Sequence, residues 1–246
     1  DFMHRNGIST EYFQVRDNER AAISLAYLDS NGDADYTFYK EEPLAATDYS
    51  MPEFTDRDYF LFGSYYSICP GLRPQVKDIL HAAHRAGTVI YYDINFRRSH
   101  IHQKQELLPV IQENCRLSSI VRGSADDFDI LFGTRDPEEI YRKHISPFCP
   151  IFICTAGSGH IFICTPKGTY DFIVPQIPAN EIVSTVGAGD SFNAGFLCAM
   201  HRQAICKADL ADMSHNQWKL LVEHGIKYSS QVCRSQDNYI KPLSDK

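Results

Sequence analysis

Short apolar runs alternate with longer amphipathic segments from about residue 58 onward. The runs at 59–62, 88–93 and 149–155 have the length and the aromatic or β-branched content of buried strands. Further strands are expected at 119–121, 160–165 and 170–174. Apolar residues recur at helical spacing in 71–86, 103–114, 125–132, 137–144, 190–203 and 216–233. This alternation predicts an α/β fold, with a largely parallel sheet covered by helices on both faces.

The part of the chain before this region has a different pattern. Residues 21–28 and 34–40 flank Asn31-Gly32, which is a strong hairpin-turn signal. We therefore expect a two-stranded hairpin within residues 20–45. Residues 1–8 are typical of the end of a helix, with Asn6-Gly7 as its C-cap. No internal repeat or low-complexity tract divides the chain, so residues 1–246 are interpreted as one domain.

Composition narrows the class of protein. The chain has 246 residues and a formal net charge of −7, which argues against nucleic acid as a partner because no basic surplus exists to neutralise phosphates. Its eight cysteines occur singly and form no C-x-x-C pair, so a zinc site is not expected. The same pattern predicts that the protein works in a reducing compartment. With no membrane-length apolar run and no signal peptide, the sequence predicts no membrane partner and a cytoplasmic location.

Several polar or glycine-rich segments directly follow predicted strands. They are Gly63-Ser64, Asp93, Thr155-Ala156-Gly157 and the loop 187–190, the last of which follows the β-branched pair Ile182-Val183. Ligands of parallel sheets bind outside the carboxyl ends of the strands. These segments are therefore expected to converge at one edge of the sheet.

The segment Gly187-Ala188-Gly189-Asp190 carries the strongest chemical signal. Residues with almost no side chain allow backbone N–H groups at the start of a helix to approach an anion such as phosphate. Asp190 is an improbable phosphate ligand, but it is suited to accept a proton from an attacking hydroxyl group. The alternative interpretation is an ordinary helix N-cap preceded by glycines.

The string from Ser184 to Phe196 resembles the second signature of the ribokinase-like (PfkB) sugar kinases, D-T-x-G-A-G-D followed by F and G. Gly187 to Asp190, Phe192 and Gly195 match it. The resemblance implies a ribokinase-like three-layer α/β/α sandwich in which the hairpin at 20–45 forms a small β lid. It is closest to the fructokinase and 2-keto-3-deoxygluconate kinase branch. It therefore implies an ATP-dependent sugar kinase that transfers the γ-phosphate to a hydroxyl group of a keto-sugar or related sugar.

The same resemblance assigns roles to individual residues. It makes Asp190 the base, and it places the backbone amides of Gly187, Ala188 and Gly189 around the transferring phosphate. The segment Asp93-Ile94-Asn95-Phe96-Arg97 resembles the family's D-x-N-x-R, so Asn95 and Arg97 are expected to contact substrate or phosphate. The alternative interpretation of this segment is an ordinary polar loop.

Two further segments match less closely. Thr155, Gly157 and Gly159 resemble the nucleotide loop T-x-G-x-x-G with its second glycine one place early, although ordinary hairpins also use glycines; Thr185 is assigned to the nucleotide as well. Ser124 and Asp127 stand where the family has N-x-x-E, so Asp127 is expected to organise Mg²⁺. The alternative for Ser124 is a helix N-cap.

Departures from the family pattern leave other readings open. Ser184 replaces an aspartate that helps to hold a monovalent cation in the family, which makes that cofactor doubtful. The family's first strand, with its sugar-binding aspartate, and its Gly-Gly-x-x-x-N motif are missing, so we expect that an N-terminal part is missing. A nucleoside kinase of the same family and a catalytically impaired nucleotide- or sugar-binding paralogue are the alternatives. The expected partners are a sugar and ATP, with a possible homodimer through the lid.

Overall fold

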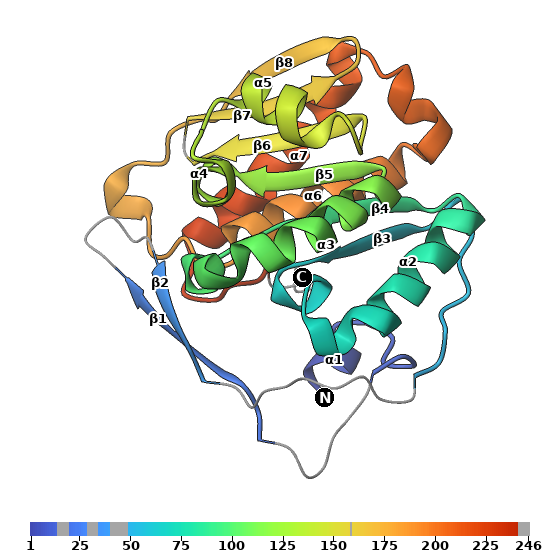
Figure 1. Cartoon of the computed structure of the whole chain (residues 1–246). Coiled ribbons are helices and arrows are strands. Elements are labelled where there is room, and N and C mark those ends of the chain that lie inside the picture. Colours follow the sequence, from blue (N-terminus) through green and yellow to red (C-terminus); the bar gives the residue numbers. More distant parts are fainter. Residues whose placement is uncertain (14–19, 29–33, 40–48, 158, 241–246) are drawn as a thin grey trace.

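The central feature of the computed structural model is a six-stranded sheet in the order β3-β4-β5-β6-β7-β8 (Figure 1). The structure describes residues 1–13, 20–28, 34–39, 49–157 and 159–240. Strands β3 to β6 are parallel, and β7 and β8 continue the sheet in antiparallel fashion. The strands are β3 (Tyr59–Gly63), β4 (Val89–Asp93), β5 (Ile120–Ser124), β6 (Ile151–Ala156), β7 (His160–Thr165) and β8 (Gly168–Ile173).

Helices cover both faces of this sheet, which confirms the predicted three layers (Figure 1). The α-helices of the described residues are α1 (Phe2–Arg5), which has no buried residue, α2 (Arg73–Ala86), α3 (Lys104–Leu117), α4 (Ala125–Phe132), α5 (Pro137–Ile140), α6 (Ala188–Arg202) and α7 (His215–Cys233). Helices α6 and α7 pack on one face, and α2 to α5 pack on the other. Consecutive residues of a strand point to opposite faces, so Tyr91 lies in the core under α6 and α7 while Tyr92 lies in the core under α3 and α4.

Helices α6 and α7 approach each other closely because each carries a glycine at the contact. A Cβ atom on Gly195 would lie 2.6 Å from the carbonyl oxygen of His224. A Cβ atom on Gly225 would lie 2.5 Å from the ring of Phe192. Any larger residue at either position would push the helices apart.

Two sequence-based expectations differ from the structure. Strand β5 continues to Ser124 instead of ending at 121, because the polar residue Arg122 is buried in it through an ion pair with Asp93. No strand contains Ile182 and Val183; the N–H of Val183 instead donates to the carbonyl oxygen of Cys233 at the end of α7. The expectation that the 187–190 loop directly follows a strand is therefore wrong.

The predicted hairpin is present as a separate two-stranded antiparallel sheet of β1 (Ile23–Leu28) and β2 (Ala34–Tyr39), drawn in blue in Figure 1. Its predicted turn, Asn31-Gly32, and residues 40–45 lie outside the described residues. Ile23, Leu25, Tyr27 and Tyr39 are exposed on this ribbon. Since Leu25 and Tyr27 are two residues apart, and Ile23 pairs with Tyr39, these side chains share one face.

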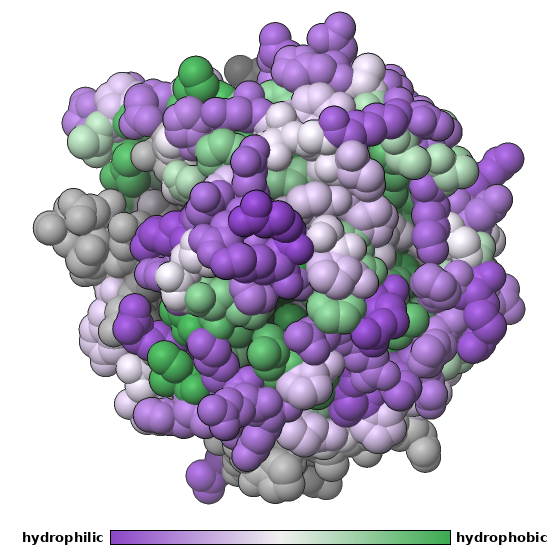
Figure 2. Space-filling model, turned by 45° about the horizontal axis from the view of Figure 1, so that its top comes forward, coloured by the Kyte–Doolittle hydropathy of each residue, from purple (hydrophilic) through white to green (hydrophobic). Residues whose placement is uncertain are grey.

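On the face drawn in Figure 2, hydrophilic residues predominate and hydrophobic ones form smaller groups between them. In the described part of the chain, no helix combines the length and the apolar character needed to cross a membrane.

Candidate active site

The carboxyl ends of β3 to β6 meet at one edge of the sheet because these four strands are parallel. Register pairs Gly63 with Asp93, Asp93 with Arg122, and Ser124 with Thr155. Helix α6 begins at the same edge, since Asn193 in its second turn donates a 2.6 Å hydrogen bond to Asp93. The predicted convergence is therefore found, with the 187–190 loop brought in by α6.

Gly187 shapes the approach to α6. Its φ of +81° is left-handed, and a Cβ atom there would lie 2.7 Å from the carbonyl oxygen of Asn238. The N–H of Ala188 donates to the carbonyl oxygen of Thr185 at 3.1 Å, which closes a turn. Within the described ranges, the N–H groups of Gly187, Gly189 and Asp190 have no hydrogen-bond partner. In this conformation the turn uses the Ala188 amide, and the amide of Asp190 joins those of Gly187 and Gly189 among the open donors.

Asp190 lies in the first turn of α6 as an exposed residue. Surrounding protein atoms nevertheless desolvate its carboxylate enough to raise its pKa above the usual range, and the charge of Asp93 raises it further. Arg122 and Arg97 act in the opposite direction. The predicted base thus lies within the electrostatic influence of Arg97, which follows β4 and is exposed.

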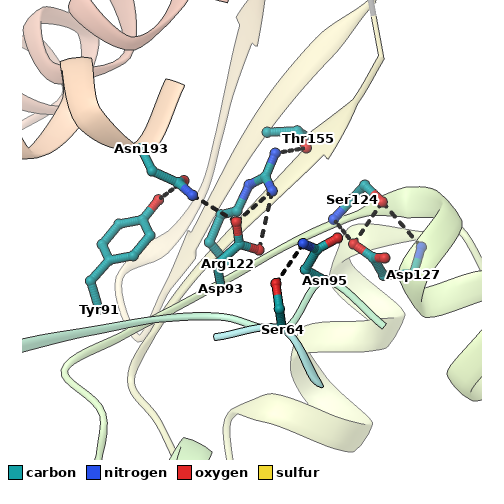
Figure 3. A network of polar contacts seen from close by, with 9 residues as sticks. All are labelled: Ser64, Tyr91, Asp93, Asn95, Arg122, Ser124, Asp127, Thr155 and Asn193. Carbon is teal, nitrogen blue, oxygen red and sulfur yellow. Dashed lines mark hydrogen bonds and ion pairs between the residues drawn. The ribbon is translucent and has the colours of Figure 1, made fainter. Parts of the chain in front are cut away.

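A buried polar network supports this edge (Figure 3). Nη1 of Arg122 donates to both carboxylate oxygens of Asp93, at 2.9 and 3.1 Å, and Nη2 donates to Oγ1 of Thr155 at 2.9 Å. Asp93 also accepts from Asn193, whose Oδ1 accepts from the hydroxyl of Tyr91 at 3.1 Å. Although burial lowers the pKa of Arg122, Asp93 outweighs this effect and keeps the guanidinium charged.

Arg122 and Asn193 are absent from the residues that the sequence predicts for the site. One signal for Arg122 was available: a single charged residue directly follows the apolar pair Ile120-Val121. A charge at such a position is buried only when it is paired. Asn193 gives no comparable signal, because one amide among the apolar residues of a helix is usually exposed.

Asn95 contacts the end of the neighbouring strand. Its Nδ2 donates to Oγ of Ser64 at 2.7 Å. Both residues have positive φ angles, +43° for Asn95 and +54° for Ser64, which are uncommon outside glycine and tend to occur at functional sites. The structure therefore places the predicted substrate residue at the expected edge.

Thr155, Gly157 and Gly159 lie where β6 turns into β7. Gly157 has a left-handed φ of +60°, and the N–H of Gly159 donates to the carbonyl oxygen of Ala156. The turn between β6 and β7 explains both glycines without any nucleotide. This turn nevertheless lies at the same edge of the sheet as the start of α6. Thr185 adjoins this edge through its bond to Ala188.

Ser124 and Asp127 form a capping box at the start of α4. Oγ of Ser124 accepts from the N–H of Asp127, while Oδ2 of Asp127 accepts from the N–H and Oγ of Ser124. Burial raises the pKa of Asp127, and the bonds from Ser124 and the charge of Arg122 oppose that rise. The N-cap interpretation of Ser124 is confirmed. Within the described ranges, no group of three or more His, Cys, Asp and Glu side chains is arranged to hold a metal ion.

Curated relatives match most of the chain. An aminoimidazole riboside kinase from Salmonella typhimurium is 27% identical over 207 residues, which are 80% of this chain and 61% of the relative. A 2-dehydro-3-deoxygluconokinase from Escherichia coli K12 is 24% identical over 80% of this chain and 67% of the relative. The chain thus spans about 61 to 67% of the length of these relatives.

Solved structures share the fold. A fructokinase from Vibrio cholerae O395, in a fructose-, ADP- and potassium-bound form, superposes with a TM-score of 0.78 at 20% identity, over 96% of this chain and 74% of the other. An aminoimidazole riboside kinase from Salmonella enterica gives 0.75 at 22% identity, over 95% and 74%. The model of the pfkB family of carbohydrate kinases matches residues 1–235, and the chain belongs to that family.

Proposed function

We propose that this protein is an ATP-dependent sugar kinase that transfers the γ-phosphate of ATP to a hydroxyl group of a keto-sugar or related sugar. One observation carries the proposal: the first turn of α6 presents a carboxylate, Asp190, beside the open N–H groups of Gly189 and of Asp190 itself. A proton acceptor and an anion-binding helix end in one turn are the two parts that alcohol phosphorylation requires.

In this mechanism Asp190 accepts the proton of the attacking hydroxyl group. The open amides of Gly187, Gly189 and Asp190 donate to the oxygens of the transferring phosphate and stabilise their charge. Arg97 adds positive charge to the same group. Asn95 holds the acceptor sugar at the ends of β3 and β4.

ATP is the proposed phosphate donor. Fructokinase structures with bound ADP and with bound ATP share the fold of this chain. We place the nucleotide against Thr155, Gly157, Gly159 and Thr185, at the edge where β6 ends and the loop before α6 begins. The hydroxyl of Thr155 accepts a hydrogen bond from Arg122, and its own O–H stays available to donate to the nucleotide.

Asp127 fits a role in organising Mg²⁺. Only its Oδ2 takes part in the capping box. Mg²⁺ in phosphoryl-transfer sites keeps several waters and needs only one or two carboxylates besides the phosphates. When bound, the ion neutralises phosphate charge. A monovalent cation stays a doubtful cofactor, because Ser184 supplies no carboxylate and its Oγ accepts the N–H of Val186.

We also propose that the hairpin serves as a lid and pairs with its copy in a homodimer. The exposed apolar face of β1 and β2, with Ile23, Leu25, Tyr27 and Tyr39, supports this. A two-stranded ribbon has little stability alone and gains by burying such a face. The cytoplasm stays our prediction for location, and none of the eight cysteines, all within the described residues, forms a disulfide.

ADP release with a panel of acceptors tests the function. Fructose, 2-dehydro-3-deoxygluconate and aminoimidazole riboside are the acceptors that the relatives' names suggest. We expect turnover with a sugar, and Asp190→Asn to reduce it roughly 10²–10⁴-fold. Asp212→Asn, at an exposed carboxylate paired with Lys167, is the matched control and is expected to leave turnover unchanged.

The same panel separates the alternatives. Preference for the riboside would favour the nucleoside kinase. Nucleotide binding without turnover on any acceptor would contradict the kinase proposal and favour the binding paralogue. Unchanged turnover in Asp190→Asn would exclude Asp190 as the base.

A further inference from the structure

The guanidinium group of Arg122 lies between three segments of the proposed site. It donates to Asp93 at the end of β4 and to Thr155 at the end of β6. On its remaining side it packs under α6: a Cβ atom on Gly189 would lie 3.3 Å from both Nη1 and Nη2. Figure 3 shows the contacts of Arg122 with Asp93 and Thr155, and the approach to Gly189 adds the turn that carries Asp190.

Stability alone is a weak reason for this arrangement. Arg122 and Asp93 are 8% and 6% exposed, and desolvating two charges offsets most of what their attraction contributes. The Nε atom of Arg122 is also buried and has no partner among the described residues. An apolar pair of similar volume would stabilise the fold at least as well. A buried donor left without an acceptor calls for a further explanation.

We propose that Arg122 is a positioning residue, which holds the first turn of α6, with Asp190 and the phosphate-facing amides, in register with the ends of β4 and β6. The inference rests on the proposed kinase function. Both Nη atoms of Arg122 donate to protein partners, so we assign its effect to its contacts with Asp93, Thr155 and Gly189.

The charge of the guanidinium group reaches Asp190 as well. The charged groups that act on Asp190 are Asp93, which raises its pKa, and Arg122 and Arg97, which lower it. Asp127 lies in the field of the same ion pair. Removal of Arg122 leaves Asp93 unbalanced and therefore makes Asp190 harder to ionise. A residue that merely fills space would have no such effect.

Two substitutions separate geometry from charge. Arg122→Lys keeps the charge but cannot reach Asp93 and Thr155 with a planar fork. We expect kcat to fall roughly 10-fold, with the acid limb of the pH profile little changed. Arg122→Met removes both the charge and the planar fork, so kcat is expected to fall roughly 10²-fold and the acid limb of the pH profile to move to higher pH.

A double variant guards against misfolding. Arg122→Met leaves a buried unpaired carboxylate, whereas Arg122→Met with Asp93→Asn removes both charges. We expect this double variant to fold, its acid limb to return toward that of the wild type, and its kcat to stay low. A kcat within twofold of the wild type in the folded double variant and in Arg122→Lys would overturn the proposal. Arg135→Met, which breaks the exposed pairs with Asp126 and Asp129, is the matched control and is expected to change neither readout.

Titration of the Asp190 carboxyl carbon by NMR provides a readout that needs no turnover. In Arg122→Met we expect the pKa of Asp190 to rise relative to the wild type, because the Arg122 charge that lowers it is lost. An unchanged pKa would show that Arg122 does not act on this turn. A wild-type protein that transfers no phosphate would overturn the proposed function, while the NMR titration would still decide the role of Arg122.

Discussion

At the scale of single residues, Asp190 has to be ionised to accept a proton, yet its surroundings favour the neutral form. Desolvation and the charge of Asp93 both raise its pKa. We therefore expect kcat/KM to fall as the pH drops through this raised pKa, so that activity is lost at a higher pH than for an ordinary aspartate. A pH profile of kcat/KM checks this. An acid limb at or below the usual aspartate pKa would contradict it.

The same shift has a consequence for stability. A carboxylate whose folded-state pKa lies above its unfolded value makes the folded state less stable at neutral pH, and the penalty is relieved as the pH falls. Asp190→Asn is therefore expected to raise Tm at pH 7 while it lowers turnover. The rise in Tm should shrink toward acidic pH, where Asp190 becomes protonated. A lower Tm at pH 7 would show that the charge is stabilised in the fold.

Gly187 allows a direct test of the turn before α6. Gly187→Ala meets both a φ of +81° and the carbonyl oxygen of Asn238, so we expect a loss of roughly 2 kcal/mol or more in unfolding free energy and a large loss of turnover. Gly133→Ala is the matched control, because its φ is +70° but no atom lies within 4 Å of its Cβ position. It should cost about 1 kcal/mol and leave turnover unchanged. Equal effects of the two substitutions would contradict this account.

At the scale of elements, α4 tests whether Asp127 serves the helix alone or a metal ion too. Ser124→Ala removes half of the capping box, so we expect about 1–2 kcal/mol less stability in chemical denaturation, with the Mg²⁺ requirement unchanged. Asp127→Asn keeps an acceptor oxygen for the box but loses the charge. A raised Mg²⁺ requirement in Asp127→Asn alone would support the metal role. If both variants require the same Mg²⁺ concentration, Asp127 serves only to cap α4.

Elements with strong periodicity were predictable from the sequence. The helices at 71–86 and 190–203 and the strand at 88–93 are all found, because their apolar spacing reflects the faces they bury. The end of β5 was not predictable in this way. Arg122 interrupts the apolar run, and only its partner Asp93, in a neighbouring strand, explains why a charge stays inside.

The site was predictable where short motifs define it and not where distant segments meet. Asn95 lies at the expected edge because parallel strands bring their carboxyl ends together, and Asp190 lies there because α6 begins at this edge. The hydrogen bond from the N–H of Ala188 to the carbonyl oxygen of Thr185 could not be predicted, because the sequence does not show which amides are used within a turn. The contacts of Asn193 with Asp93 and Tyr91 join residues about a hundred positions apart and leave no local pattern.

At the scale of the whole molecule, the interpretation of residues 1–246 as one domain stays a prediction, as does the dimer. Leu25→Asp places a charge on the apolar face of the hairpin, so we expect the homodimer to dissociate. Light scattering coupled to size-exclusion chromatography measures this. Ser24→Asp lies one residue away and points to the other face of the ribbon, so it is expected to leave the dimer intact. A monomeric wild type would exclude this dimer.

The paired glycines of α6 and α7 decide which part of the molecule stays still. With Gly195 against a backbone carbonyl of α7 and Gly225 against the ring of Phe192, neither helix can slide or roll past the other without a collision. The helix that carries Asp190 in its first turn is therefore held in place against α7. A substitution that widens the contact at Gly195 is therefore expected to displace the turn that carries Asp190 and to lower kcat, although Gly195 lies more than one helical turn from Asp190.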